Sequence, residues 1–256
     1  MTSQCAITLD LDWAPDFAID LVAERLRRAG VCATFFVTHD SPAVRRLAAD
    51  APYFELGVHP NFDVGSSHGA STGAVMEHVM SLVPEARVVR SHRLLQSMPI
   101  LDRIFEEPGL QTDLSLFLPG VPHLRPFEYA RCGRRCRRVP YFWEDSFEAE
   151  LEAPAWDPTV YAALPGLQVF NFHPIHVFLN SNSMGPYRQL RAAAARMSEV
   201  TAEQAEPYCN VGALGAADMF GALLERCQHG FAPTISELVA GTKAGCSGLV
   251  SGAGYW

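Results

Sequence analysis

The sequence lacks several features that define whole classes of protein. No stretch approaches the roughly 18 uninterrupted apolar residues of a membrane-spanning helix, and the first ten residues lack the basic start and apolar run of a secretory signal. We therefore expect a cytoplasmic protein with no membrane span. Lysine is almost absent, since Lys243 is the only one among 20 basic residues, and the net charge is −8. Because affinity for nucleic acid depends on clustered basic residues, we expect no nucleic-acid partner.

Two further absences narrow the choice. No Gly-rich loop follows the first predicted strand, which disfavours a nucleotide-binding fold. The seven cysteines are odd in number and scattered, so we expect free thiols and not a disulfide framework. Cys132 and Cys136 form the only close pair, and a single pair of this spacing is a poor signal for structural zinc.

What the sequence does contain is a regular alternation of strand and helix patterns. The opening ITLDLDW predicts a strand with acidic residues at its end, and the stretch from Pro15 to a glycine cap at Gly30 predicts a helix. Further strands are predicted at 31–38, 53–58, 87–91, 112–118, 138–143 and 169–173, and further helices at 42–50, 72–82, 99–107, 187–197, 216–227 and 234–240. This alternation favours an α/β fold in which helices cover a parallel sheet.

The positions of the polar residues favour a distorted (β/α) barrel over an open sheet. Each of five polar residues lies at or just after the C-terminal end of a predicted strand: Asp10, Asp12, His59, Arg90 and His173. In an α/β barrel those ends converge on one mouth, whereas an open sheet would spread them along an edge.

The chain predicts a single domain over residues 1–240 with two less regular parts. An irregular, loop-rich insertion is expected at about 119–166, and a flexible Gly-rich tail at 241–256. Within the insertion, the run RCGRRCRR at 131–138 holds five arginines. We expect a solvated loop there, with an anion site for a phosphate-bearing substrate as the alternative.

Asp10 and Asp12 are the first candidates for chemistry. Two residues apart on a strand, they point to the same face at a distance of roughly 6–7 Å. A bound cation explains two like charges this close, and a carboxylate combined with imidazoles suits a divalent metal such as zinc. The alternative is a solvated pair at the end of a strand, or a cap of the next helix.

The segment ELGVHPNFDVGSSHG supplies two histidines for such a site. His59 ends a buried strand, and His68 follows in a Gly/Ser loop that is able to fold back. Two imidazoles and one carboxylate leave a coordination position open for water, as catalytic metal sites do. Asp63 competes with His68 for the place of third protein ligand. Judged alone, each histidine is more often a hydrogen-bonded structural residue.

Further polar residues follow other predicted strands. Arg90 and His92 end the strand at 87–91, and a guanidinium beside Asp10 would hold that carboxylate in place and keep it ionised. An ordinary salt bridge at the rim is the alternative. His173 ends the strand VFNFH, and a histidine at a barrel mouth can donate a proton to a leaving amine.

Trp143 and Asp145 lie at the end of the strand at 138–143. The carboxylate can orient an imidazole, and the ring can line a sugar pocket, although such a ring is as often part of the core. We group these two residues with His92 as candidate substrate-binding residues.

In this order, the motifs ITLDLDW, ATFFV, ELGVHPNF with SSHG, VVRSH and VFNFH resemble those of the NodB-type polysaccharide deacetylases of carbohydrate esterase family 4, and most closely their WbmS-like branch. The likeness covers roughly residues 5–180 and implies a distorted (β/α) barrel that holds one divalent metal. The implied roles are general base for Asp10, partner of that base for Arg90, general acid for His173, and metal ligands for Asp12, His59 and His68.

The sequence departs from the family pattern in three places. The usual adjacent aspartates are split by Leu11, so the roles of base and ligand are open to exchange. The usual His-x-x-x-His becomes His59 with a ligand nine positions later, or with Asp63. The segment RSHR lacks the family's proline and glycine, which leaves the oxyanion donor unassigned and allows His92 to enter the pocket.

The sequence therefore predicts a metal-dependent amidohydrolase. It would remove an acyl group, most directly acetyl, from an N-acyl amino sugar or a related small intracellular molecule. The expected cofactor is one zinc ion, with cobalt, nickel, manganese and iron as alternatives. Two rival hypotheses are a hydrolase of a non-sugar C–N bond, as in allantoinase-like relatives of the fold, and a catalytically silent protein whose metal organises a binding pocket.

Overall fold

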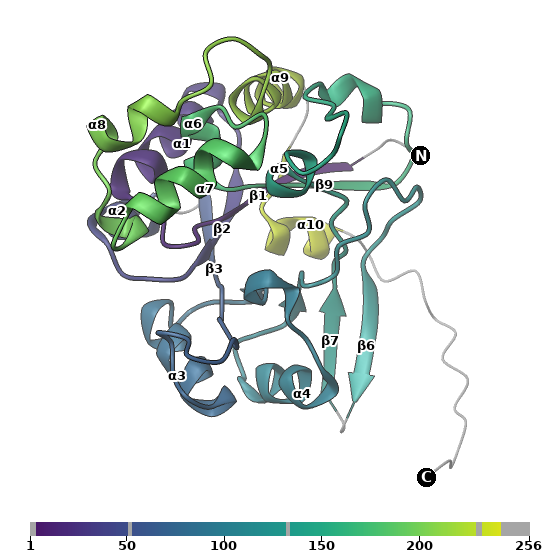
Figure 1. Cartoon of the computed structure of the whole chain (residues 1–256). Coiled ribbons are helices and arrows are strands. Elements are labelled where there is room, and N and C mark those ends of the chain that lie inside the picture. The colour runs from purple at the N-terminus through teal and green to yellow at the C-terminus, as the bar shows by residue number, and fades with distance from the viewer. Residues whose placement is uncertain (1–3, 51–52, 132–133, 229–231, 242–256) are drawn as a thin grey trace.

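In the part of the chain that the structure describes, the fold is built on one mixed sheet of nine strands. The computed structural model describes residues 4–50, 53–131, 134–228 and 232–241. The strand order is β6-β7-β5-β4-β3-β2-β1-β9-β8, and all neighbours pair in parallel except the β6/β7 hairpin (Figure 1). The strands are β1 (Gln4–Asp10), β2 (Ala33–Val37), β3 (Phe54–Val58), β4 (Val88–Val89), β5 (Thr112–Asp113), β6 (Phe127–Arg131), β7 (Arg134–Arg138), β8 (Trp143–Glu144) and β9 (Leu167–Phe172).

Helices connect the parallel strands. They are α1 (Asp16–Ala29), α2 (Pro42–Ala49), α3 (Thr72–Leu82), α4 (Met98–Glu106), α5 (Asp145–Glu148), α6 (Pro174–Leu179), α7 (Met184–Ala193), α8 (Ala202–Ala205), α9 (Ala216–Gln228) and α10 (Ile235–Gly241). Short 3₁₀ turns lie at His92–Leu94, Pro158–Tyr161, Met197–Glu199 and Glu206–Tyr208. In Figure 1, α1, α2, α6 and α7 gather on one side of the sheet, and α3 and α4 lie apart from them in the lower part of the view, with α4 beside β7. No helix among the described residues is long and apolar enough to cross a membrane.

Local sequence signals set where the helices begin and end. Three helices start after a serine that accepts a hydrogen bond from the first turn, and these caps are Ser41 for α2, Ser71 for α3 and Ser97 for α4. Helix α1 ends at Gly30, whose φ of +66° is the left-handed conformation that glycine adopts without strain. The capped helix starts therefore fix the loops that leave the C-terminal ends of the strands.

The sheet curls because the chain between β7 and β8 pairs on both sides. Val139 N donates to Asp113 O at 2.9 Å and Tyr141 N to Leu116 O at 3.0 Å, so this segment continues the edge beside β5. One residue later, Phe142 N donates to Val169 O of β9 at 3.2 Å. These bonds bring the two ends of the sheet toward each other as a curled half-barrel, and the predicted distorted (β/α) barrel is confirmed.

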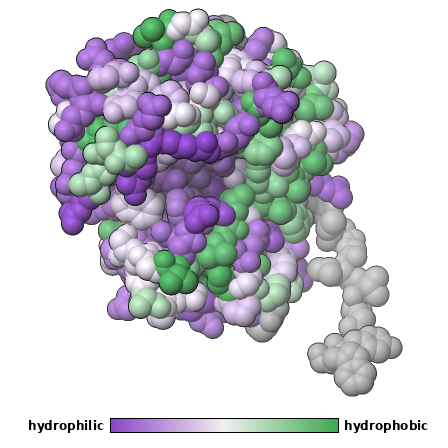
Figure 2. Space-filling model, in the orientation of Figure 1, coloured by the Kyte–Doolittle hydropathy of each residue, from purple (hydrophilic) through white to green (hydrophobic). Residues whose placement is uncertain are grey.

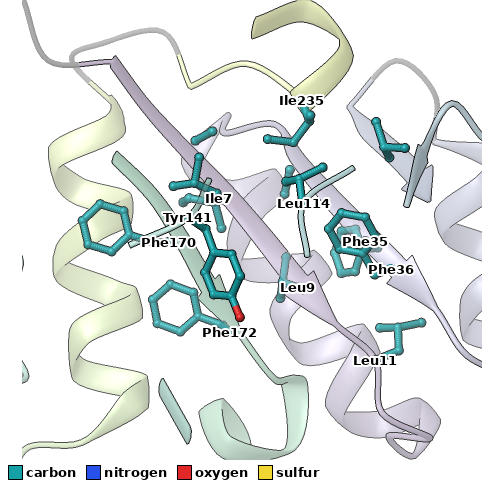
Figure 3. Packing of buried hydrophobic residues seen from close by; sticks show 14 of the residues in the cluster. Ile7, Leu9, Leu11, Phe35, Phe36, Leu114, Tyr141, Phe170, Phe172 and Ile235 are labelled. Carbon is teal, nitrogen blue, oxygen red and sulfur yellow. The ribbon is translucent and has the colours of Figure 1, made fainter. Parts of the chain in front are cut away.

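The core lies between the sheet and its helices. Strand β2 is buried along its whole length, and Phe35 pairs with Leu9 of β1 in the register of the sheet (Figure 3). Aromatic side chains of β9, Phe170 and Phe172, extend the same cluster. Burial on both faces explains why these strands read as continuous apolar runs in the sequence.

The arginine-rich segment corrects one prediction. It forms the antiparallel hairpin of β6 and β7, and the predicted solvated loop is wrong. Arginines of β7 have partners within the fold, since Arg138 Nε lies 2.8 Å from Asp113 Oδ2 and Arg137 Nη1 donates to Val239 O at 2.9 Å. Arg135 pairs with Glu128 across the hairpin at 2.9 Å. Cys132 and most of the predicted tail, residues 242–256, lie outside the described residues, and Gly241 ends α10.

Candidate active site

Polar side chains from four strands meet at one mouth of the curled sheet. Asp10 is the last residue of β1, His59 follows β3, Arg90 follows β4 and His173 follows β9. The molecular surface is hollowed at a hydrophilic region on the face shown in Figure 2. Because the strands are parallel, their C-terminal ends bring residues from distant parts of the sequence together, as predicted for a barrel mouth.

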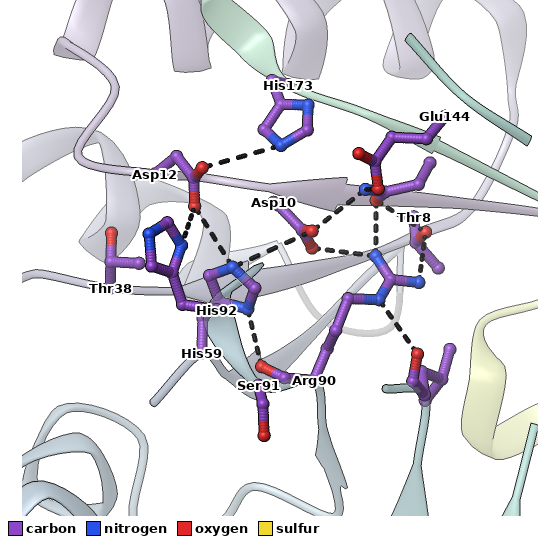
Figure 4. Close-up of polar contacts among 12 residues, drawn as sticks. Thr8, Asp10, Asp12, Thr38, His59, Arg90, Ser91, His92, Glu144 and His173 are labelled. Carbon is purple, nitrogen blue, oxygen red and sulfur yellow. Dashed lines mark hydrogen bonds and ion pairs between the residues drawn. The ribbon is translucent and has the colours of Figure 1, made fainter. Parts of the chain in front are cut away.

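Asp12, His59 and His92 form a compact group that could hold a metal ion. One ligand atom from each lies within 4.8 Å of the others. Asp12 Oδ1 lies 3.1 Å from His59 Nε2 and 3.0 Å from His92 Nδ1 (Figure 4). Burial would raise the pKa of Asp12, but hydrogen bonds from the two imidazoles outweigh it and hold that pKa well below its usual value. An ionised carboxylate facing two imidazoles is the donor set of a divalent metal site.

Local backbone geometry aims these ligands. Asp12 and Trp13 have positive φ angles of 44° and 56°, so the chain turns sharply after β1 and presents Asp12 to the histidines. His59 Nδ1 lies 2.6 Å from Arg90 O, so Nδ1 donates to that carbonyl and Nε2 is the atom that faces Asp12. Strained backbone in non-glycine residues is typical of functional sites, where the surrounding structure maintains it.

The structure does not place His68 in this group. Its Nε2 lies 2.8 Å from Thr38 O, and its Nδ1 accepts a hydrogen bond from Asn61 N at 3.1 Å. Burial lowers the pKa of His68 to about 4, so the ring is neutral and both of its nitrogens are engaged with backbone. Asp63, the other expected third ligand, pairs with Arg93 at 2.9 Å. His92, which we had grouped with substrate binding, lies in the group with Asp12 and His59 instead.

Asp10 lies in a buried polar network behind the group. Its Oδ1 accepts a hydrogen bond from Arg90 Nη1 at 2.8 Å, and its Oδ2 accepts one from Asn171 Nδ2 at 2.9 Å. Burial would raise the pKa of Asp10, but the charges of Arg90, His59 and His173 outweigh it and lower that pKa. Asp10 is therefore a carboxylate at neutral pH.

Arg90 is the most deeply buried charged side chain of the network. It is fully inaccessible and lies between the rings of Phe36 and Tyr141, with its guanidinium 4.5 and 4.3 Å from the ring centroids. Its Nη2 donates to Thr8 Oγ1 at 3.0 Å. The arginine thus holds Asp10 from the core side, and it does not lie at the rim.

Sequence reasoning missed Thr8 and Asn171. The two residues face each other in the register of β1 and β9, and Thr8 Oγ1 donates to Asn171 Oδ1 at 3.0 Å. A signal for them exists, because each is a polar residue inside an otherwise apolar strand, and buried polar groups require partners. The identity of those partners follows only from the strand register.

His173 faces Asp12 of the candidate metal group from the end of β9. Its Nδ1 lies 2.6 Å from Asp145 Oδ1, its backbone N donates to Asp145 Oδ2 at 2.7 Å, and its Nε2 lies 3.6 Å from Asp12 Oδ2. Burial would lower the pKa of His173, but the ion pair and hydrogen bond with Asp145 outweigh it and raise that pKa well above its usual value. Asp145, which we had grouped with substrate binding, is 1% exposed and orients the imidazole from behind.

Comparison with known proteins assigns the family. The family model described as "WbmS-like: Polysaccharide deacetylase" matches residues 7–191, a span that contains every member of the group described above. The chain belongs to the WbmS-like polysaccharide deacetylases. This family identity makes the WbmS-like chain a hydrolase of amide bonds that acts on an acyl-bearing substrate.

Solved structures agree with the assignment. WbmS from Bordetella bronchiseptica, which is assigned to the polysaccharide deacetylases and to O-antigen biosynthesis, is 31% identical to the WbmS-like chain. The match covers 87% of this chain and 90% of that one, with a TM-score of 0.73. A 4-alpha-glucanotransferase from Thermococcus litoralis shares only the fold, with 9% identity, a TM-score of 0.51, and coverage of 95% of this chain and 39% of that one. No curated protein matches the sequence.

The mouth of the WbmS-like chain holds a cavity of about 130 Å³ that includes Asp10, Asp12 and His173 in its wall. Trp143, which we expected to line a sugar pocket, is 2% exposed and packs on Phe172 at 5.0 Å between ring centroids. Side chains alternate between the faces of a strand, so Trp143 enters the core and Glu144 faces the cavity.

Proposed function

We propose that this WbmS-like chain removes an acyl group, most directly acetyl, from an N-acyl amino sugar or a related small molecule, with one divalent metal ion held by Asp12, His59 and His92. The observation that supports this is the placement of Asp10 and His173 on either side of that ligand group. A base and an acid that flank a metal site are the parts needed to hydrolyse an amide.

The donor set fits a metal such as zinc. One carboxylate and two imidazoles suit zinc, and cobalt, nickel, manganese and iron accept the same donors. A metal ion held there would polarise the amide carbonyl and lower the pKa of the attacking water. The hydrogen bond from His59 Nδ1 to backbone orients the His59 ring, and the turn at Asp12 orients the Asp12 carboxylate. Both ligands are therefore held in place by the protein itself.

Asp10 is the proposed general base. Its carboxylate is ionised and is held by Arg90 and Asn171, which leaves further lone pairs to accept a proton from water. Asp12 directly contacts both histidines of the group, which supports it as the ligand. These contacts favour Asp10 as the base and Asp12 as the metal ligand over the opposite assignment of the two roles.

His173 is the proposed general acid. Its raised pKa keeps the imidazole protonated at neutral pH, and Asp145 fixes the ring with Nε2 toward the mouth. Nε2 can therefore give its proton to the amine nitrogen as the C–N bond breaks.

The substrate class rests on the family. WbmS of Bordetella bronchiseptica is assigned to O-antigen biosynthesis, which supports an amino sugar of a glycan or its precursor. The arginines of β7 give no support to a phosphate site, because Arg135, Arg137 and Arg138 have partners within the fold.

Metal removal and restoration test the proposal. Hydrolysis of N-acetylglucosamine oligosaccharides, followed by acetate release, and hydrolysis of ureides, followed by loss of the ureide, are measured on protein treated with a chelator and again after zinc is added back. We expect release from the amino sugars to fall to background without metal and to return with about one equivalent of zinc. Full activity without metal would contradict the proposal. One bound zinc with no turnover of any amide would instead favour the silent binding protein.

A further inference from the structure

The wall of the catalytic cavity carries a second polar group that the proposed reaction does not use. Tyr141, Glu144 and Ser146 line the same cavity as Asp10 and His173. All three belong to the segment around β8 and the start of α5. In Figure 4 the Glu144 carboxylate points toward the space in front of Asp10 and His173.

Neighbouring donors fix the orientation of this carboxylate. Glu144 Oε2 accepts hydrogen bonds from Tyr141 Oη at 2.7 Å and from Asn171 Nδ2 at 3.3 Å, and Oε1 accepts one from Ser146 Oγ. Burial, and to a lesser extent the charge of Glu144, raises the pKa of Tyr141 well above its usual value. The Tyr141 hydroxyl therefore keeps its proton and donates to Glu144. A carboxylate has about four acceptor sites, so three donors leave capacity for one more.

Two arginines lie near Glu144: Arg93 lines the cavity, and Arg90 is buried behind it. Both are already engaged with other partners. Arg90 donates to Asp10, to Asn171, to Thr8 and to Leu114 O. Arg93 pairs with Asp63 at 2.9 Å. Neither of these arginines is therefore left unpaired beside Glu144 to bind an anion.

We propose that Glu144 determines specificity by accepting a hydrogen bond from a neutral donor, such as a sugar hydroxyl, next to the acylated nitrogen, and by disfavouring an anionic group at that position. This inference rests on the proposed function, because it takes the acyl group to lie at the metal site. The cavity of about 130 Å³ is smaller than the roughly 300–1,000 Å³ of sites that enclose a drug-sized ligand. It therefore admits the acylamino group and its nearest ring substituents, and the rest of a glycan lies outside.

The test compares two disaccharides that differ in charge beside the acylamino group. One is the β-1,4-linked dimer of N-acetylglucosamine. The other carries a lactyl ether, and thus a carboxylate, on the hydroxyl oxygen of the ring carbon that neighbours the acylamino carbon, as in N-acetylmuramic acid. Binding by calorimetry and acetate release are both measured for the zinc-loaded wild type and for Glu144→Gln. Glu150→Gln is the matched control, since Glu150 is an exposed carboxylate on the following turn that pairs with Arg188.

We expect the wild type and Glu150→Gln to bind the neutral sugar at least about tenfold more tightly than the anionic one, because like charges in contact are strongly unfavourable. Glu144→Gln should reduce that ratio to near one while its thermal unfolding stays close to that of the wild type. An unchanged ratio in Glu144→Gln would overturn the inference, as would failure of the wild type to prefer the neutral sugar. A ratio that changes as expected without acetate release from either sugar would support the inference and refute the proposed function.

Discussion

Replacing His173 with glutamine is expected to lower kcat for deacetylation by about 10²- to 10⁴-fold, the usual contribution of a positioned acid or base. Glutamine keeps a polar group of similar length beside Asp145 but cannot deliver a proton to the leaving amine. Substrate binding should change little, so the loss should appear in kcat and not in KM. Steady-state kinetics with zinc-saturated protein measures both constants.

The ion pair between His173 and Asp145 provides a control for this prediction, because changing Asp145 should alter the pH dependence of the rate. Asp145→Asn removes the charge that raises the pKa of His173, so the imidazole loses its proton at a lower pH. The fall in rate at alkaline pH should therefore begin earlier in Asp145→Asn than in the wild type. If His173→Gln retained near wild-type kcat, or if Asp145→Asn left the pH profile in place, His173 would not be the acid.

Replacing His92 with asparagine is expected to abolish stable zinc binding and, with it, turnover. Loss of an outer hydrogen-bond partner typically costs 10- to 100-fold in metal affinity, so loss of a direct ligand should exceed about 100-fold. The reason is the position of His92 Nδ1, 3.0 Å from the same oxygen of Asp12 that faces His59. Zinc content after dialysis and a competition titration with a chromophoric chelator measure the affinity.

His68→Asn is the matched control for this change. Asparagine can still accept from Asn61 N or donate to Thr38 O, the two contacts that His68 makes. We expect this variant to keep zinc affinity within a few-fold of the wild type. The reverse result, with zinc lost in His68→Asn and kept in His92→Asn, would refute the proposed ligand set and restore the one expected from the sequence.

The sequence was sufficient to predict the framework of the fold. The stretch from β1 to α3 has strong local signals, because β2 is apolar throughout and α2 and α3 begin after capping serines. Such signals depend on neighbours within a few residues. The hairpin of β6 and β7 was missed because a run of arginines resembles a solvated loop until the partners of its side chains are known.

The site was predictable to the extent that strand ends define it. Asp10, Asp12 and His59 lie at or just after such ends, and the fold brings both carboxylates within 4 Å of His59 Nε2. The choice between His68 and His92 depended on how two loops fold, and no spacing in the sequence encodes that. The ring of His68 is bound to the backbone of Thr38 and Asn61, whereas the turn after β4 delivers His92 to Asp12.

Trp143 shows a different limit. Period-two alternation along β8 places Trp143 and Glu144 on opposite faces, but the sequence does not say which face borders the core. The aromatic cluster with Phe172 decides the matter in favour of the core for Trp143. Glu144 is then left facing the reacting groups.

The most direct measurement is the anomalous diffraction of a crystal grown with zinc, recorded at the zinc absorption edge. The account predicts one strong peak at the mouth of the sheet, about 2.0–2.2 Å from Asp12 Oδ1, His59 Nε2 and His92 Nδ1. A zinc ion held by His68 or Asp63 in place of His92 would contradict the ligand set. Absence of any peak near Asp12 at saturating zinc would contradict the metal site itself.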